Sequence, residues 1–339
     1  GDRRADGVIN GSIGVIDTLQ KIKSHPHYLS KKNGVYVGRG VSLGFCRNNS
    51  GPACLVASVL SDGTVSLVEG SVDIGGSRTA IAQIVAEVLG LNAEDVIPQV
   101  GDTESIGFTS VTGGSGVVYK TGWAAHEAAI DIKNQIIKRA AIIWDKDVSG
   151  IEYSDGSVKH ISDSELKMSF KEIASQINET GEPIIGKANV NPGGSTGSYS
   201  ALIADVQVDP ETGKVDLLKL TAFQDVGYAI HPSYVEGQIQ GGIAQGIGWA
   251  LNEEYFYDDN GIMKNSSLLD YRMPISLDLP EIDAVLVETP NPNHPYGVKG
   301  VGEASISAPL AAIANAINDA VGIRLRSLPM KPQKLQARL

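Results

Sequence analysis

The sequence is poor in cysteine and has no long hydrophobic run. Only two of its 339 residues are cysteines, Cys46 and Cys54, and they form no CxxC pair, which excludes a disulfide framework and favours reduced thiols. No apolar run approaches the roughly 18 residues of a membrane-spanning helix. The opening residues GDRRADGVIN lack the apolar core of a signal peptide. We therefore expect a cytoplasmic protein that does not enter a membrane.

Basic residues are also scarce. The chain has 28 Lys and Arg against 39 Asp and Glu, a net charge of −11, so we do not expect the clustered positive charge that binds nucleic acid or an anionic membrane. The histidines are scattered, and the pair His25 and His27 has no second ligand cluster, so we expect no zinc site. The length suits about two domains.

Glycine is the residue in excess, with 39 copies. The glycines gather in five runs: DIGGS, VTGGSG, NPGGSTGS, EGQIQGGIAQGIG and YGVKGVGE. Any single run can be explained as a turn or a helix cap. All five together favour several close approaches of the backbone to one large ligand, because glycine leaves room for a bulky ring and exposes N–H groups.

Apolar spacing and turn residues predict an alternation of strands and helices. Helices are expected over residues 12–25, 78–91, 118–144, 162–181, 232–254 and 307–322. Strands are expected over residues 34–45, 53–60, 64–70, 96–100, 148–162 (a hairpin), 199–209, 214–227 and 282–289. The expected fold class is α+β, with two similar-sized domains of mixed sheets and helices. We expect a connecting segment over residues 1–34 and domains over 35–190 and 191–339, with the boundary near NPGGSTGS.

Glu303 stands out as a single carboxylate in the glycine-rich stretch GVKGVGEAS. Two interpretations are open from the residues alone. It is a general base, presented on a loop and raised in pKa if buried, or it is an ordinary acidic residue in the first turn of the following helix.

Other catalytic patterns are absent or weak. VTGGSG offers hydroxyls and backbone N–H groups for a phosphate or a metal-oxo group, and DIGGS precedes a helix start that suits a phosphate. A Walker P-loop, a Rossmann fingerprint and a nucleophile elbow are all missing. Asp225 and His231 are a conceivable acid–base pair, although a simple turn after a strand also accounts for them.

The motifs taken together resemble the C-terminal molybdopterin-binding region of the molybdenum hydroxylases, the xanthine dehydrogenase and aldehyde oxidoreductase family. The resemblance rests on DIGGSRTAIAQIVAEVLGL, DTESIGFTSVTGGSG, DVGYAIHPSYVEGQIQGGIAQGIGWALNEE, LLDYRMP and YGVKGVGEASISAPLAAIANAINDA. It covers about residues 35–335. It implies the fold of that family's molybdenum-cofactor-binding domains.

The resemblance also implies site residues. Glu303 matches the family's catalytic base, which takes a proton from the Mo–OH group, and Gly114 is expected near the metal as well. No side chain is expected to bind molybdenum directly, because the pterin dithiolene holds it. The implied cofactor contacts are Gly75, Gly76, Ser77, Thr112, Gly113, Gly114, Ser115, Gly116, Gln238, Gln245, Lys299, Gly300, Val301 and Gly302. DIGGS departs from the family's Gly-Gln-Gly loop, because Gly76 or Ser77 stands where the glutamine is expected.

A larger departure concerns length. The N-terminal half of the family's molybdenum region, the iron–sulfur cysteines and a flavin domain are all missing from the chain. The chain thus resembles the medium molybdopterin subunit of a split enzyme such as nicotinate dehydrogenase; the alternative is a fragment of a larger polypeptide. This implies a molybdopterin cytosine dinucleotide cofactor and three partners: a subunit with the missing half, a [2Fe–2S] subunit and an FAD subunit.

The expected reaction is hydroxylation of an electron-poor carbon in a small N-heteroaromatic substrate such as nicotinate, with water as the oxygen source. A purine or aldehyde hydroxylase of the same family is an alternative. A non-catalytic scaffold or cofactor-insertion protein is another, although the intact Glu303 favours an enzyme.

Overall fold

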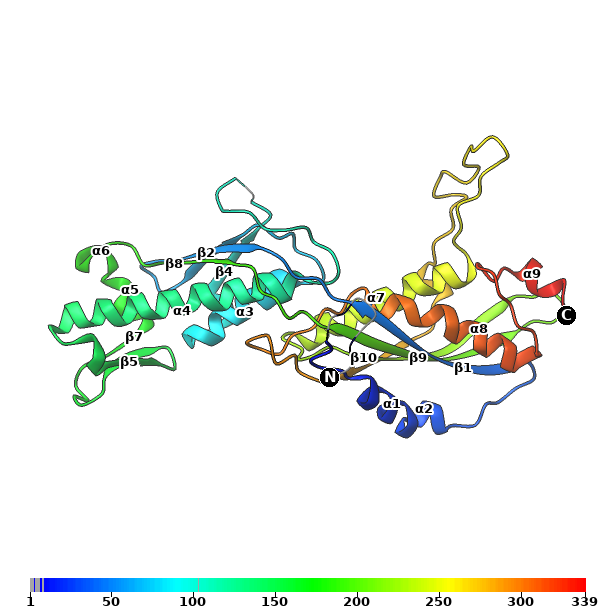
Figure 1. Ribbon diagram of the computed structural model, residues 1–339, viewed down its shortest axis with the longest axis horizontal. Coiled ribbons are helices and arrows are strands. Elements are labelled where there is room, and N and C mark those ends of the chain that lie inside the picture. The colour runs from blue at the N-terminus through cyan, green and yellow to red at the C-terminus, as the bar shows by residue number, and fades with distance from the viewer. Residues whose placement is uncertain (1–2, 4–6, 8, 103) are drawn as a thin grey trace. The chain divides into compact units, whose positions relative to one another are not determined.

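The structure of the chain is a computed structural model that describes residues 3, 7, 9–102 and 104–339 (Figure 1). Several of the first residues of the expected connecting segment therefore lie outside the described residues. The chain divides into two compact units. Unit 1 consists of Gly1–Asn48, Thr196–Asn291 and Lys299–Leu339, and unit 2 consists of Asn49–Ser195 and Pro292–Val298.

Unit 1 contains a four-stranded sheet in the order β1-β9-β10-β11. Its strands are β1 (Val37–Arg47), β9 (Gly197–Val208), β10 (Val215–Asp225) and β11 (Ile282–Val287). β10 and β11 are parallel, and the other neighbours are antiparallel. In unit 1, helices α7 and α8 cover one face of the sheet, and α1 and α2 lie on the other (Figure 1). The helices are α1 (Val15–Ser24), α2 (Pro26–Leu29), α7 (Pro232–Leu251), α8 (Ala308–Val321), α9 (Pro332–Gln336) and the 3-10 helices η3 (Ser276–Asp278) and η4 (Ala304–Ser307).

Unit 2 contains a four-stranded sheet in the order β4-β3-β2-β8 and a three-stranded sheet in the order β5-β6-β7. The strands are β2 (Ala53–Val59), β3 (Val65–Glu69), β4 (Val96–Val100), β5 (Ile151–Ser154), β6 (Ser157–His160), β7 (Lys167–Ser169) and β8 (Ile185–Val190). The helices are α3 (Ser77–Leu89), α4 (Val117–Trp144), α5 (Phe170–Ser175), α6 (Ile177–Thr180) and the 3-10 helices η1 (Ala93–Asp95) and η2 (Val148–Gly150). Both units combine mixed sheets with helices, so the expected α+β class is confirmed.

The division of the chain differs from the expected one in two places: at its N-terminal side, and at Pro292–Val298, which belongs to unit 2 and not to the expected second domain. The sequence separates residues 35–190 from 191–339, and the chain does pass from unit 2 to unit 1 at Ser195. However, β1 belongs to unit 1, because it pairs along its whole length with β9, from Val37 opposite Gln207 to Arg47 opposite Gly197. Residues 1–34 likewise belong to unit 1, where Ile22 of α1 packs on Ala201 and Phe223.

Glycines in β1 let helix α8 lie directly on the strand. A Cβ added at Gly38 would come within 2.0 Å of the Ala316 carbonyl oxygen, and one at Gly40 within 1.9 Å of the Ala312 carbonyl oxygen. Both contacts are with backbone, which cannot move aside as a side chain can. These glycines therefore serve helix–strand packing and not ligand binding.

One expected helix is wrong in its first part. The spacing predicts a single helix over 162–181, but Lys167–Ser169 pairs with β6 as strand β7. Helix α5 begins only after this strand, where the Ser169 hydroxyl accepts a hydrogen bond from the Glu172 backbone N at 3.2 Å. Strand pairing thus prevails over the helical spacing.

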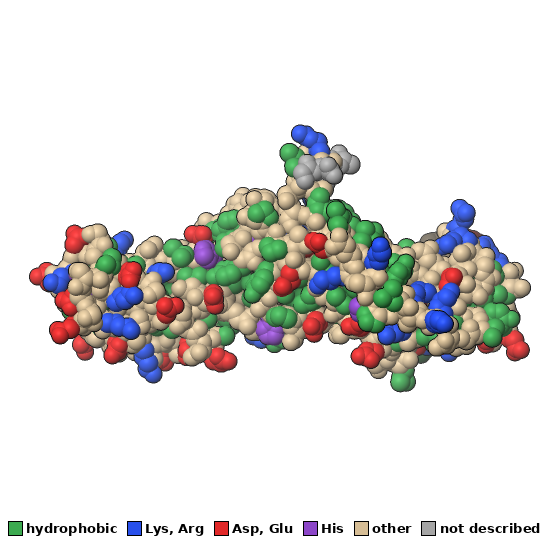
Figure 2. Space-filling view, turned by 90° about the horizontal axis from the view of Figure 1, so that it is seen from below, with side chains coloured by type: hydrophobic (Ala, Val, Ile, Leu, Met, Phe, Trp, Pro, Cys, Tyr) green, Lys and Arg blue, Asp and Glu red, His purple; other side chains and the backbone are tan. Residues whose placement is uncertain are grey.

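The surface agrees with the low basic content of the sequence. Acidic and basic side chains are interspersed with apolar ones over the face that Figure 2 shows. Among the described residues, no helix is long and apolar enough to cross a membrane.

Glu69, the last residue of β3, is a carboxylic acid in the core of unit 2. Its side chain lies on the same buried strand face as Val65 and Leu67. Burial raises the pKa of Glu69 to about 8, and the Ser71 hydroxyl opposes this shift. Because the folded state holds the proton more tightly than the unfolded state, the free energy of unfolding should fall as the pH rises from about 5 to 8.

Glu69→Gln cannot ionise and should remove this decline. At pH 8 its free energy of unfolding is expected to exceed that of the wild type by roughly 1–3 kcal/mol. Urea unfolding of the full chain at pH 5, 6, 7 and 8 measures how the free energy of unfolding depends on pH in the wild type and in Glu69→Gln. The substitution Glu165→Gln, at an exposed position, is the control. An equally steep decline in Glu69→Gln would contradict the assignment.

Candidate functional site

Glu303 lies in unit 1, immediately before the 3-10 helix η4 that leads into α8. Its side chain is exposed. This chain therefore does not provide the burial that the general-base interpretation includes. Burial and, to a smaller extent, the charge of Glu303 raise the pKa of the Cys46 thiol at the end of β1. Glu303 therefore lies at a helix start and also presents an accessible carboxylate.

The backbone around Glu303 is fixed from its buried side; residues 299–305 are called the Glu303 loop. The Gly300 backbone N donates to Asn48 Oδ1 at 3.0 Å, and the Gly300 carbonyl accepts from the Ser198 hydroxyl. The Val301 carbonyl accepts from Gln224 Nε2 at 2.6 Å, and the Ala304 carbonyl accepts from Ser200 Oγ at 2.6 Å. The four supporting side chains are buried and come from the strands β9 and β10 and the end of β1. A loop held in this way presents one carboxylate in a fixed place.

An ion pair anchors the start of the Glu303 loop. Lys299 Nζ lies 2.7 Å from Asp225 Oδ2, and both side chains are fully buried. Asp225 also accepts hydrogen bonds from the backbone N of Gly14 at 3.0 Å and of Gly227 at 3.2 Å. Burial raises the pKa of Asp225 and lowers that of Lys299, and each charge opposes the shift of the other. The Lys299 ammonium is thus engaged within unit 1, so its expected contact with a cofactor is left to its backbone.

Asp225 and His231, which the sequence allows as an acid–base pair, have different partners in the structure. Asp225 bonds Lys299, whereas His231 caps helix α7 and its ring stacks on Tyr234 at 3.9 Å between centroids. The simpler interpretation, a turn and a cap after a strand, accounts for both residues.

Helix α7 lies against the Glu303 loop through glycines. A Cβ added at Gly242 would come within 1.9 Å of Ser305 Oγ and 2.9 Å of the Gly302 carbonyl oxygen. Gln238 and Gln245 stand one turn before and one turn after Gly242 on the same helix, half-buried and exposed respectively. Both expected glutamines therefore lie on the part of α7 next to the loop.

Gly242→Ala is expected to push the Glu303 loop from its position and to lower the free energy of unfolding by roughly 1–3 kcal/mol. Gly241→Ala is the matched control, because a Cβ at Gly241 meets no heavy atom within 4 Å. It should be neutral or stabilise the chain by up to about 1 kcal/mol through its helix propensity. Equal effects of the two substitutions in urea unfolding would contradict the close approach.

The remaining expected contacts lie in unit 2, at the starts of two helices. Gly75 and Gly76 have φ angles of 59° and 77° and lead into α3. Thr112, Gly113, Gly114, Ser115 and Gly116 lead into α4. Helices α3 and α4 run in the same direction. Gly122 of α4 lies against Ile84 of α3. Farther along both helices, Tyr153 donates to the carbonyl of Leu89 in α3 and lies under Lys133 of α4. Their N-termini therefore point to the same end of unit 2.

Side chains shape the loop before α4. Gly114 has φ of 57°, its carbonyl accepts from the Asn49 backbone N at 2.9 Å, and a Cβ there would overlap the Asn49 side chain. The buried Lys120 donates to the carbonyls of Ser110 at 2.6 Å and Val111 at 2.8 Å, and burial lowers its pKa. Gly113, by contrast, has open space where a Cβ would be. The loop is fixed on one side and open on the other.

These features fit a large anionic cofactor. Two helix N-termini offer backbone N–H groups and positive dipole ends to phosphate groups. In unit 2, the open space at Gly113 leaves room for a ligand against the backbone. Among the described residues, no group of three or more His, Cys, Asp or Glu could hold a metal ion.

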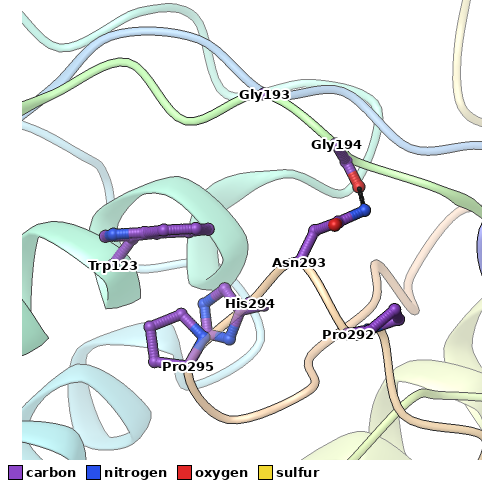
Figure 3. A pocket seen from close by; sticks show the side chains of 7 residues that line it. All are labelled: Trp123, Gly193, Gly194, Pro292, Asn293, His294 and Pro295. Carbon is purple, nitrogen blue, oxygen red and sulfur yellow. Dashed lines mark hydrogen bonds between the residues drawn. The ribbon is translucent and has the colours of Figure 1, made fainter.

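Unit 2 also has a concave site of about 670 Å³, lined by Trp123, Gly193, Gly194 and residues 292–295 (Figure 3). Asn293 Nδ2 donates to the Gly194 carbonyl at 3.3 Å. The Tyr296 backbone N donates to His294 Nδ1 at 3.1 Å, so Nε2 carries the hydrogen that faces the Tyr119 carbonyl at 3.1 Å. Burial lowers the pKa of His294 to about 4, which leaves its ring neutral near pH 7.

The sequence missed the residues that hold the Glu303 loop. Asn48, Ser198, Ser200 and Gln224 carry no motif, and their contacts span 77 to 252 positions in the chain. One signal was present, since polar residues at the buried ends of apolar strands must find hydrogen-bond partners.

Comparison with known proteins agrees with these features. Residues 20–280 match the family model described as a molybdopterin cofactor-binding domain. The chain is 32% identical to the putative xanthine dehydrogenase molybdenum-binding subunit of Escherichia coli (strain K12), over 81% of this chain and 37% of that protein. It is 30% identical to the nicotine 6-hydroxylase large subunit of Paenarthrobacter nicotinovorans, over 95% of this chain and 43% of that protein.

Solved structures show the same likeness. Quinoline 2-oxidoreductase from Pseudomonas putida 86 aligns with a TM-score of 0.78 and 28% identity, over 89% of this chain and 42% of that chain. The Cu,Mo-CO dehydrogenase aligns with a TM-score of 0.81 and 25% identity, over 89% of this chain and 40% of that chain. The chain spans about two fifths of the length of these relatives.

Proposed function

The chain belongs to the family of molybdopterin cofactor-binding domains of the molybdenum hydroxylases, and from this premise we propose that it supplies the general base and part of the cofactor cradle of such an enzyme. The observation that carries the proposal is the Glu303 loop. Its backbone is fixed by buried side chains, while the Glu303 carboxylate is exposed. An ordinary helix-start residue does not need such support.

Glu303 would act as the base. Its carboxylate accepts the proton of the water-derived oxygen nucleophile as that oxygen attacks an electron-poor carbon of the substrate, and the fixed loop holds the carboxylate at the reacting atoms. The wall that excludes water from this carboxylate would come from the rest of the enzyme.

The cofactor we propose is molybdenum with molybdopterin cytosine dinucleotide. When bound, it supplies the oxygen-transfer and redox chemistry. In unit 2, Gly75, Gly76, Ser77 and residues 112–116 would hold its phosphate groups, with Gly114 near the metal. In unit 1, Gln238, Gln245 and the backbone of residues 299–302 would contact it. Electrons would pass to [2Fe–2S] clusters and FAD on partner subunits.

The substrate we propose is a small N-heteroaromatic compound of the nicotinate type. Two proteins to which the chain is similar are named for N-heteroaromatic substrates, nicotine and quinoline. Another is named for xanthine, and a further relative is an aldehyde oxidoreductase subunit, so purine and aldehyde hydroxylation are the competing proposals. We further propose that the enzyme works in the cytoplasm, where its two free cysteines stay reduced.

The test is product formation by the intact enzyme in ¹⁸O-labelled water. Nicotinate, a purine and an aldehyde are offered separately, and the ¹⁸O content of each product is measured. The proposal predicts ¹⁸O in a hydroxylated heteroaromatic product. If only the purine or only the aldehyde is turned over, the substrate belongs to that class instead. Turnover of none, in an assembly that holds molybdenum, would favour a scaffold or insertion role.

A further inference from the structure

A segment of unit 1 extends away from helix α7 with a defined structure of its own. Residues 252–281, called the arm, connect α7 to β11 and are the yellow-to-orange segment beyond the end of α7 in Figure 1. Tyr257 and Met263 form an antiparallel bridge in it. The Asn265 side chain accepts from the Phe256 backbone N at 2.9 Å and donates to the Glu254 carbonyl at 2.7 Å. These bonds give the arm a defined shape.

The arm nevertheless exposes its large apolar side chains. Leu268, Leu269 and Leu277 are 79%, 91% and 90% exposed. Other large apolar residues on the arm are also exposed: Tyr255, Phe256, Tyr257, Ile262, Met273 and Ile275. Exposed apolar residues scattered singly are ordinary, but such a concentration in thirty residues marks an interaction surface.

The contacts of the arm with the rest of unit 1 are made at its base. Glu254 pairs with Lys331, and Glu253 and Pro274 lie beside Gly248 of α7. Between residues 252 and 281 the sequence has seven carboxylates against two basic residues. Large exposed apolar side chains together with polar ones are the usual composition of a protein interface. The matching surface would be an apolar groove bordered by basic side chains.

We infer that the arm docks onto the polypeptide that corresponds to the part of the relatives that this chain does not match. This rests on the proposed function. The match to the family model extends through the arm, to residue 280. The relatives carry about three fifths of their length outside the part that this chain matches, so the two parts must meet over a surface in the working enzyme. Permanent interfaces of this kind are large and apolar, as the arm is.

Photo-crosslinking in the intact enzyme tests the inference. Leu269 is replaced by a benzophenone amino acid, and the crosslinked peptide is identified by mass spectrometry. The expected peptide comes from the part of the enzyme that corresponds to the relatives' remaining length. Leu29, 67% exposed on α2, is the control position and should not give the same peptide. A crosslink to a second copy of this chain, to an iron–sulfur or flavin subunit, or to nothing would overturn the inference.

Substitution provides a second, independent measurement. Leu268→Ser with Leu269→Ser should weaken assembly at least tenfold, because two buried leucines are lost from the interface. The thermal unfolding of the chain alone should not change. Ile142→Ser, 70% exposed in unit 2, is the matched control and should assemble as the wild type does. Unchanged assembly of the double variant would overturn the inference.

The molybdenum content of the wild-type assembly separates the two proposals. If the wild-type assembly lacks molybdenum while the arm variants still fail to assemble, the proposed function fails and the docking surface stands. If molybdenum is present and the variants assemble normally, the docking surface fails alone.

Discussion

Replacing Glu303 by glutamine should lower kcat of the intact enzyme by about 10²–10⁴-fold, the contribution of a positioned general base. Glutamine has nearly the same size and cannot accept the proton. The hydrogen bonds of Gly300, Val301 and Ala304 that fix the loop are made by their backbone, which the substitution leaves unchanged. The variant should therefore keep its fold and its molybdenum, and lose only the chemical step.

The control for this substitution is Glu165→Gln, an exposed carboxylate in unit 2. It should retain the kcat of the wild type. Steady-state kinetics and molybdenum analysis are measured on the same preparations. Full activity in Glu303→Gln would remove Glu303 from the reaction, whereas loss of both activity and molybdenum would make it a structural residue of the cradle.

Lys299→Met is expected to have the largest effect on stability. Removing one partner of a buried ion pair leaves the other charge without compensation, at a cost of about 3–5 kcal/mol. Lys299 and Asp225 are both fully buried, 2.7 Å apart. Because Lys299 begins the Glu303 loop, kcat should fall as well, since the loop loses its anchor.

Lys214→Met is a matched control. Lys214 lies 2.7 Å from Asp216, the same separation as in the buried pair, but these side chains are 65% and 50% exposed. Its loss should leave the free energy of unfolding close to that of the wild type, because solvent screens an exposed pair. A second variant, Lys299→Met with Asp225→Leu, should recover part of the stability because no unpaired charge remains. Similar costs for Lys299→Met and Lys214→Met in urea unfolding would contradict the anchoring role.

Local signals in the sequence predicted most helices and strands. Helix α3 was expected over residues 78–91 and is found at Ser77–Leu89, because Gly90 ends it with a left-handed φ of 64°. Helix α8 ends in the same way at Gly322. The strands β9 and β10 follow from alternation of apolar residues and the turn PETG between them. Such features depend on residues only a few positions apart.

Tertiary contacts could not be predicted in the same way. In α1, Ile16, Leu19 and Ile22 have the spacing of one apolar face, but Ile16 is 64% and Leu19 44% exposed, and Thr18 is buried beside Ile22. The buried face is set by the sheet on which α1 packs, where Ile22 lies against Ala201 and Phe223. The pairing of β1 with β9 also joins segments about 150 residues apart, which no local pattern indicates.

The residues of the candidate site also fall into two groups: those that local sequence patterns indicate and those that only the fold brings together. Glycine runs and Glu303 are visible in the sequence because their composition is unusual. The residues that support Glu303, among them Asn48 and Gln224, are ordinary polar residues whose role depends on the fold. The structure adds an internal ion pair with Asp225 for Lys299, which the sequence analysis did not predict.

The most direct test of the proposed cradle is the molybdenum and pterin content of the assembly purified with its native partners. We expect molybdenum and a pterin dinucleotide in amounts stoichiometric with this chain, retained in Glu303→Gln. An intact native assembly that contains neither molybdenum nor pterin would contradict the claim that the chain forms part of a molybdenum-cofactor cradle.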